Sequence, residues 1–302
     1  MTDAVALGGQ PRARAGGRIA ALVGAACYGL NIPIAKIATD MGVEGAALIV
    51  VRAGLCITGF CLAGLIWRWR PALAKGDATN VGLVSLFAAG CAVGYLGAVT
   101  RLPVSVAVIV FYTFPLWIIL YTVARQGRSA AFRLVAFALA FAGILVVVGL
   151  DIGRFSLSGL LMALVASICT AALFIVGAKV RTDKITVLFY LQGPSFAAAL
   201  IFMLLAGNAP PAALLAAAAL PIVLSGIGYY LGFFFQLVAA GRMNAAAAGL
   251  LFLFEPVVAI TVSVLLLGEA MTPSKLAGIA LVLSGLALDV MLEQRRIRRI
   301  GA

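Results

Sequence analysis

Ten apolar runs of nearly membrane-spanning length fill most of this 302-residue chain and limit its fold more than any other feature. A helix needs about 20 apolar residues to cross a bilayer. With 64% hydrophobic and 11% charged residues, a soluble domain could not bury so much apolar surface. The runs are 19–37, 46–67, 81–100, 104–124, 133–150, 158–180, 185–206, 212–239, 245–267 and 276–291. We therefore predict an all-α integral membrane protein with ten transmembrane helices, the first of which is too long for a signal peptide.

The basic residues predict how these helices are oriented. The chain has a net charge of +12. If the N-terminus is cytoplasmic, 17 of the 22 Lys and Arg fall in cytoplasmic loops and tails, and the outer loops hold only Arg101, Arg154 and Lys275. This split follows the positive-inside rule. It predicts a multi-pass protein of the cell inner (plasma) membrane with both termini in the cytoplasm, and it explains the charge without a nucleic-acid partner.

Matching segments at nearly one spacing indicate an internal duplication. The pairs are 35–40 with 178–183, 101–115 with 242–256, and 133–134 with 275–276, at offsets of 143, 141 and 142 residues. Each half holds five helices, an odd number, so the second half enters the membrane from the opposite face. Such inverted repeats are typical of secondary transporters, whose substrate site lies near the midplane between the halves.

The repeat also divides the chain into parts. We expect a basic cytoplasmic N-terminal tail at 1–18, a first five-helix repeat at 19–150, a second at 158–291, and a basic cytoplasmic C-terminal tail at 292–302. The spacings Gly90-x-x-x-Gly94 and Gly228-x-x-x-Gly232 predict close approaches of the third and eighth helices to their neighbours.

Several function classes are disfavoured. The chain has no histidine, and its five cysteines lie in apolar runs without paired spacing, so we expect no metal, no cofactor and no disulfide. The sequence contains no HExxH or GxSxG motif and one carboxylate at midplane depth, so an intramembrane enzyme is disfavoured. A channel is also disfavoured, because no filter-like motif is visible.

The chain resembles the drug/metabolite transporter superfamily, specifically its EamA type with ten helices. The resemblance rests on Tyr28-Gly29 and Lys36 in the first helix, Arg52 in the second, and the segment 245–269 with Glu255-Pro256 in its middle. It extends over about residues 18–291 and is closest to amino-acid exporters with broad and aromatic substrates. It implies export of amino acids or related metabolites, or of drug-like cations, by alternating access.

Glu255 and three prolines carry the mechanistic hypotheses. Glu255 lies near midplane, where an unpaired carboxylate is costly, so it either binds a substrate amine or a proton, or braces the helix at Pro256. Pro115 and Pro256 stand at matched depth and indicate interrupted helices that line a cavity, although a plain packing kink is the alternative. Pro33 is a further candidate kink in the first helix.

Charged and polar side chains near the midplane complete the candidate site. Arg52 is expected to pair with Asp40 or Glu44, Lys36 to act as an outer anchor, gate or ion pair, and Asp289 to pair with a neighbouring arginine. Hydroxyl, amide and ring groups could bind a zwitterion with an apolar side chain, although packing is the alternative for each. Together with Glu255, the candidate substrate-binding residues are Asn31, Tyr95, Tyr112, Trp117, Gln192, Tyr229, Tyr230 and Gln236.

The residues alone thus predict a small-molecule transporter in a lipid bilayer. The resemblance narrows it to an exporter of amino acids or related metabolites, with a multidrug or cationic-compound exporter as the alternative. The physiological substrate, proton coupling and oligomeric state are left open.

Overall fold

The computed structural model describes residues 11–127, 131–149 and 156–300, and within them the chain forms helices and connecting turns. Arg154, one of the outer-loop charges, lies outside this part. The helices are α2 (Pro11–Asp40), α3 (Gly45–Trp67), α4 (Ala78–Val99), α5 (Val104–Phe111), α6 (Phe114–Gln126), α7 (Phe132–Val148), α8 (Leu157–Gly177), α9 (Lys184–Ala206), α10 (Ala212–Ala217), α11 (Ala219–Arg242), α12 (Ala245–Leu251), η2 (Phe252–Phe254), α13 (Glu255–Leu267) and α14 (Pro273–Ile300).

The all-α membrane architecture is confirmed. Among the described residues, nine helical spans are long and apolar enough to cross a membrane, and α7 is a shorter apolar helix of 17 residues. Two boundaries differ from the prediction. The eighth apolar run is split at Ala218 into α10 and α11, and α14 continues to Ile300, so most of the predicted C-terminal tail is helical.

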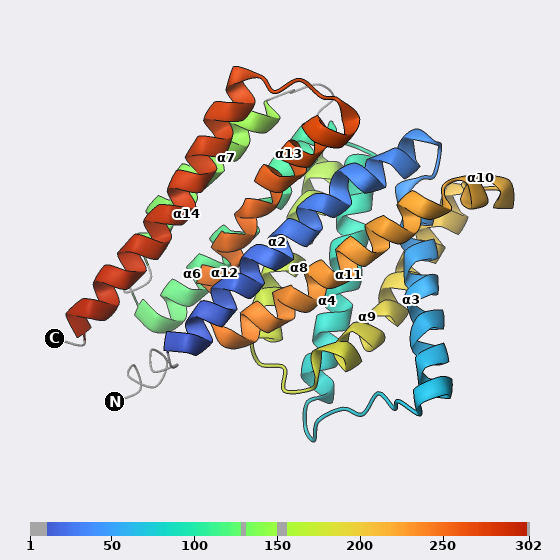
Figure 1. Ribbon diagram of the computed structural model, residues 1–302, viewed down its shortest axis with the longest axis horizontal. Helices are drawn as coiled ribbons and strands as arrows, with labels where there is room; N and C mark the ends of the chain where they lie inside the picture. Colours follow the sequence, from blue (N-terminus) through green and yellow to red (C-terminus); the bar gives the residue numbers. More distant parts are fainter. Residues whose placement is uncertain (1–10, 128–130, 150–155, 301–302) are drawn as a thin grey trace.

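The packing of the helices follows the two related halves. If the ten crossings are numbered along the chain, α2 packs along α11 as the first and eighth, and α4 packs along α8 as the third and sixth. The repeat relates these two pairs to each other, because it relates the first crossing to the sixth and the third to the eighth. In the other two pairs, α3 with α9 and α7 with α14, each helix packs along its own counterpart in the other half. Figure 1 shows α2 and α11 side by side in the centre, with α7 and α14 together at one edge and α3 at the other.

One related pair breaks this symmetry. α4 packs along α9, whereas the corresponding pair, α11 and α3, makes only sparse contact. A crevice of about 180 Å³ lies between α3 and α11 instead. The two halves therefore adopt different arrangements on the two sides of the bundle.

Glycines set the close helix approaches. A Cβ atom on Gly94 of α4 would lie 2.7 Å from the Met162 carbonyl oxygen of α8, and one on Gly232 of α11 would lie 2.7 Å from the Tyr28 ring of α2. Only glycine fits where a neighbouring backbone or a packed ring approaches this closely. The two predicted GxxxG approaches are confirmed, and they occupy related helix pairs.

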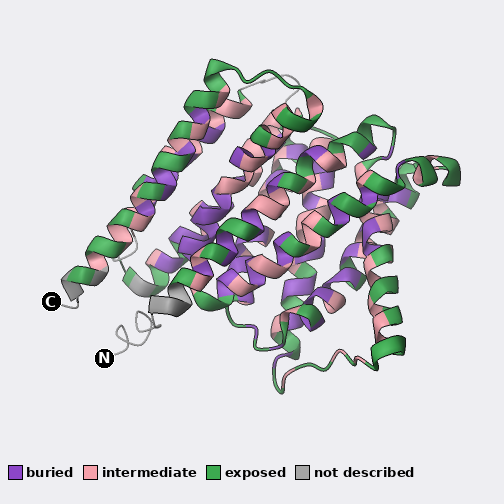
Figure 2. Cartoon of the chain, viewed as in Figure 1, coloured by how far each residue is buried: buried purple, intermediate pink, exposed green. Residues whose placement is uncertain are grey.

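Apolar side chains on the outside of the bundle identify the surface suited to lipid. α3 is mostly exposed at the edge of the bundle, whereas burial is concentrated in the central helices (Figure 2). Leu65 and Trp67 near its end are 78% and 74% exposed. Exposed apolar area of this extent requires a nonaqueous surrounding.

Buried ions join three helices at the end of the bundle where α2 begins and α14 ends. Arg133 of α7 contacts Asp289 at 3.3 Å and Glu293 at 2.8 Å, and Glu293 also accepts from Arg18 of α2 at 2.5 Å. The expected pairing of Asp289 with an arginine is confirmed. Because Glu293 lies beyond the predicted last span, the helical extension of α14 is what brings it to α2 and α7.

A second polar contact fastens two loops together at the start of α4. The Asp77 side chain is buried and accepts from Thr182 N at 2.7 Å, Thr182 Oγ1 at 2.7 Å, Arg181 N at 2.9 Å and Asn80 Nδ2 at 2.8 Å. Burial by itself would raise the pKa of Asp77, but these hydrogen bonds outweigh it and lower the pKa to about 2. Asp77 thereby links the α3–α4 loop to the α8–α9 turn.

Candidate substrate site between the two halves

The fourth and ninth membrane helices are both interrupted. α5 ends at Phe111 before α6 begins, and α12 passes through the 3₁₀ turn η2 into α13. Pro115 and Pro256 each stand in the first turn of the second segment. Proline has no N–H, and its ring clashes with the carbonyl four residues earlier, here that of Phe111 or Phe252. Both helices therefore change their hydrogen-bonding pattern next to these prolines, whereas α2 continues through Pro33.

Glu255 begins α13 at one of these breaks, and its carboxyl group interacts with three tyrosines. The Tyr112 hydroxyl lies within hydrogen-bonding reach of its carboxyl group, and Tyr28 and Tyr95 are close enough to interact with it electrostatically. Within the described part of the chain, no basic side chain forms an ion pair with Glu255. The carboxyl group is therefore available to a proton or to a cationic ligand.

Close backbone packing holds Glu255 in place. A Cβ atom on Gly29 would lie 2.6 Å from the Glu255 carbonyl oxygen, so α2 packs directly on the start of α13. Glycine is therefore needed at position 29 for a structural reason. A larger residue would push α2 away from the start of α13.

Tyr28 connects the two halves through its ring and its hydroxyl group. Its hydroxyl donates to Gln236 Oε1 of α11 at 3.0 Å. Its ring centroid lies 5.7 Å from that of Tyr229 and 6.0 Å from that of Phe252. The Tyr95 ring lies 5.4 Å from the ring of Phe111 at the end of α5. The result is a polar and aromatic cluster contributed by both halves.

Arg52 has partners other than those predicted. Its Nη1 donates to Asn31 Oδ1 at 2.9 Å, and its Cζ lies 5.2 Å from the centroid of the Tyr229 ring. The expected pairing with Asp40 or Glu44 is wrong, because Asp40 pairs with Lys36 at 2.7 Å and Glu44 accepts from Asn208. Both acids are nearer the exposed end of the bundle, whereas the Arg52 side chain turns inward to α2 and α11.

The structure separates the candidate residues into two groups. Asn31, Tyr95, Tyr112, Tyr229, Gln236 and Glu255 join the cluster around Tyr28 and Arg52. Gln192 lies on α9 and donates to the Leu188 carbonyl of its own helix. Trp117 packs on the hydrophobic core, with its indole N–H buried and without a hydrogen-bond partner in the described residues. Lys36 and Asp40 form an exposed pair.

Three residues of the cluster were not singled out from the sequence as pocket residues. Tyr28 is three residues before Asn31, Cys91 is four residues before Tyr95, and Phe111 precedes Tyr112. Helical spacings of three and four place residues on one face, so these periodicities could have identified the first two. Cys91 Sγ lies 3.2 Å from Thr170 Oγ1, which links α4 to α8 beside the cluster.

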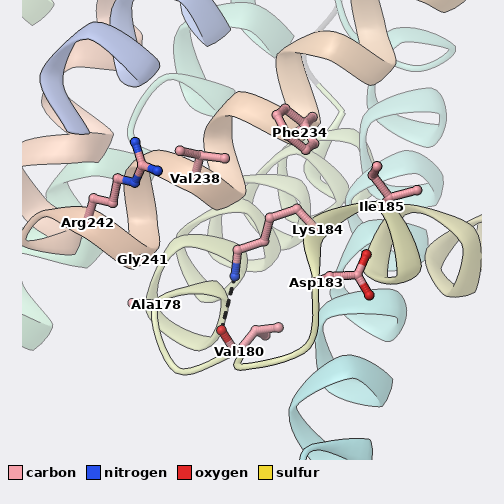
Figure 3. A pocket seen from close by; sticks show the side chains of 9 residues that line it. All are labelled: Ala178, Val180, Asp183, Lys184, Ile185, Phe234, Val238, Gly241 and Arg242. Atoms are coloured by element: carbon pink, nitrogen blue, oxygen red, sulfur yellow. Dashed lines mark hydrogen bonds between the residues drawn. The ribbon is translucent and has the colours of Figure 1, made fainter. Parts of the chain in front are cut away.

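Two cavities lie at different places relative to the cluster. The larger, about 520 Å³, is at the ends of α8 and α11 and the start of α9, where Lys184 and Arg242 line it (Figure 3). Lys184 Nζ donates to the Val180 carbonyl at 3.0 Å, and none of the predicted substrate-binding residues reaches this cavity. The smaller crevice between α3 and α11 is lined by Arg52 and Tyr230 and so adjoins the cluster.

Comparison with known proteins gives a match to the overall fold and a match to the second half of the sequence. Residues 157–291 match the model of the EamA-like transporter family. A solved crystal structure is similar to this chain with a TM-score of 0.71 and 21% sequence identity, covering 91% of this chain and 98% of the other. At this identity the likeness concerns the fold alone. No curated protein matches the sequence.

These findings define a class. The chain is a multi-pass helical membrane protein whose polar and aromatic cluster lies between two related five-helix halves. Its second half, residues 157–291, is the part that is similar to the EamA-like transporter family.

Proposed function

We propose that this protein is an exporter of amino acids or related small metabolites in the plasma membrane, with both termini in the cytoplasm. The observation that carries the proposal is Glu255, which begins the second segment of the ninth membrane helix and interacts with Tyr28, Tyr95 and Tyr112. A carboxyl group can bind an ammonium group, and aromatic rings favour both cations and apolar side chains. The interrupted helix places these groups between the two halves, as transporters of inverted-repeat architecture require.

The mechanism we propose is alternating access around this cluster. Breaks at Pro115 and Pro256 give the fourth and ninth helices segments that can reorient separately, because i→i+3 hydrogen bonds replace the α-helical pattern at these points. The tight pair α4–α9 and the loose related pair α3–α11 support the proposal, since exchanging them would open the bundle to its other side.

A multidrug or cationic-compound exporter is the second candidate. Glu255 among tyrosines favours it, because a permanent cation can bind a carboxylate and aromatic faces without any anion-binding group. Amino acids remain the first candidate because, within the superfamily, the sequence as a whole most resembles the amino-acid exporters with broad and aromatic substrates.

Purified protein in proteoliposomes tests the two candidates. Vesicles preloaded with aromatic or neutral amino acids should release them faster than protein-free vesicles, with and without a pH gradient. A panel of quaternary ammonium compounds is run in parallel. Equal leak of every compound from both kinds of vesicle would contradict a transport function, and release of the cations alone would favour the second candidate.

Glu255→Gln tests the role of the carboxyl group. If Glu255 carries protons during transport, this substitution should abolish any pH dependence of export while leaving counterflow exchange intact. Glu269→Gln is the control, because Glu269 pairs with Lys275 at the exposed start of α14. A pH dependence that persists in Glu255→Gln would exclude Glu255 as the proton carrier.

A further inference from the structure

Arg52 is a buried cation in the membrane-spanning helix α3. It is 9% exposed, and none of the acidic residues in the described chain forms an ion pair with it. Arginine stays protonated in proteins, so its charge cannot be removed by loss of a proton. An uncompensated charge at this depth is costly, and such residues mark ligand or ion pathways in membrane proteins.

The surroundings of Arg52 hold its guanidinium group in one place. Its aliphatic stem crosses Gly226 of α11, where a Cβ atom would lie 3.3 Å from Arg52 Cγ. Its Nη1 donates to Asn31 of α2, and its Cζ lies over the Tyr229 ring. α2, α3 and α11 thus position the group together, as expected for a binding group whose geometry has to be fixed in advance.

Most of its hydrogen-bonding capacity is unused. A guanidinium group has five N–H donors in a planar fork, and one of its nitrogen atoms has a protein partner in the described residues. The neutral amide of Asn31 solvates this donor but does not balance the charge. The stacking of Arg52 on Tyr229 leaves the edge of the fork, where the donors point, to another ligand.

The adjoining crevice has room for such a ligand. It measures about 180 Å³, and Arg52 lines it together with Tyr230 and apolar residues such as Leu55 and Ile227. The one charged side chain among its lining residues is Arg52. An apolar space with one fixed cation fits an organic anion that has an apolar body.

We infer that Arg52, Asn31 and Tyr229 form a binding site for the carboxylate of an organic acid or amino acid. The guanidinium fork matches a carboxylate in two parallel hydrogen bonds, and Asn31 and Tyr229 hold the fork in position. This inference deepens the proposed function, on which it rests for the identification of the ligand as cargo. In this arrangement, Arg52 of α3 would bind the carboxylate of the substrate. Glu255 would bind its amine at a separate place.

Ligand binding to the purified full chain in detergent, where phospholipid headgroups are removed, tests this site apart from transport. The probes are phenylalanine, its amide, which lacks the carboxylate, and 3-phenylpropanoate, which lacks the amine. Each is titrated by tryptophan fluorescence or thermal stabilisation. The wild-type protein should bind both carboxylates at least tenfold more tightly than the amide.

Substitutions of Arg52 should remove this preference. Arg52→Gln should weaken binding of both carboxylates at least tenfold and leave the amide within about twofold, and Arg52→Lys should give an intermediate loss because it keeps the charge without the fork. Arg101→Gln is the matched control, since Arg101 follows the end of α4 and its side chain donates to the Gly97 carbonyl of that helix. If Arg52→Gln does not yield folded protein, Arg52→Lys decides the result.

The outcomes separate the site from the proposed function. Binding of 3-phenylpropanoate that depends on Arg52, without binding or export of amino acids, would support the site and refute the amino-acid cargo. Export of amino acids with an unchanged carboxylate preference in the Arg52 variants would refute the site alone. Failure of both carboxylates to bind the wild-type protein would also overturn the inference.

Discussion

At the scale of single residues, Asp77 illustrates how one carboxylate outside the membrane spans can fasten two loops. Its side chain is buried and accepts four hydrogen bonds, three of them from Arg181 and Thr182 across the loop contact. A buried carboxylate is stable only when its lone pairs are satisfied in this way. Nothing in the local sequence around Asp77 indicates a partner 104 or 105 residues away.

Removing this carboxylate should destabilise the protein. We expect Asp77→Ala to lower the free energy of unfolding by about 2–3 kcal/mol, since it leaves buried N–H and hydroxyl donors unsatisfied. Asp40→Ala is the control. It should lower the free energy of unfolding by less than about 0.5 kcal/mol, because Asp40 and its partner Lys36 both have side chains that are more than half exposed. Unfolding by SDS in mixed micelles measures both. Equal losses would contradict the assigned role of Asp77.

The low pKa of Asp77 predicts an acid-sensitive contribution to stability. Because the folded-state pKa is lowered to about 2, the charged form is favoured by folding. This stabilisation is complete above about pH 4, the ordinary range of an aspartate, and is lost as the pH falls towards 2. Asp77→Asn should therefore show a smaller decrease in unfolding temperature than the wild type between pH 4 and pH 2. Parallel decreases would refute the linkage.

At the scale of helices, glycines decide which pairs approach closely. Gly94→Ala should weaken the α4–α8 pair by about 1–3 kcal/mol, because the added Cβ would lie 2.7 Å from the Met162 carbonyl oxygen and 2.9 Å from Ala166 N. Gly82→Ala, on the same helix, is the control, since nothing lies within 4 Å of a Cβ there. It should leave stability unchanged or raise it by up to about 1 kcal/mol. A comparison of the two unfolding curves measures the difference.

The interrupted helices make a prediction about rate. Pro115→Ala and Pro256→Ala restore an N–H that can donate to Phe111 or Phe252, so each should favour a continuous helix. We expect substrate export to slow about tenfold, corresponding to about 1.4 kcal/mol in the barrier, with a smaller change in substrate affinity. Pro194→Ala is the control, because α9 is continuous through Pro194 and this residue is exposed. A tenfold loss in all three variants would mean that the breaks have no special role.

At the scale of the whole molecule, the loop charges predict the orientation in the membrane. In a background without the five native cysteines, Ala209→Cys should be labelled by an impermeant maleimide from outside the cell. Ala72→Cys should be labelled only after permeabilisation, because the loop charges place it in the cytoplasm. Both positions are exposed and close to helix ends, which makes them comparable. The reverse pattern would overturn the predicted N-in topology.

The asymmetry of the bundle also belongs to this scale. Related helix pairs would pack alike in a perfectly symmetric molecule, yet α4 packs along α9 while α11 barely contacts α3. This difference opens the crevice that adjoins Arg52. Two sequences related by duplication can therefore create a site on one side that has no equivalent on the other.

Much of the architecture was determined by the sequence alone. The ten apolar runs, the offsets near 142 residues and the matched prolines predicted the helices, the duplication and the two interruptions. These features are local or periodic, and hydropathy, glycine spacing and the missing proline N–H act on each segment wherever it lies in the fold. The polar candidates near Glu255 were found for the same reason, since midplane depth can be counted along a helix.

Only the tertiary structure decided which of these groups meet. Arg52 was expected to bind Asp40 or Glu44, which are near in sequence, but its side chain lies between α2 and α11 and contacts Asn31 and Tyr229. Gln192 has a similar depth to the cluster residues, yet it faces its own helix backbone on α9. The rotation of each helix about its axis and the choice of its neighbours depend on packing across the whole bundle. Hydropathy is nearly uniform around these helices, so the local sequence does not specify either of them.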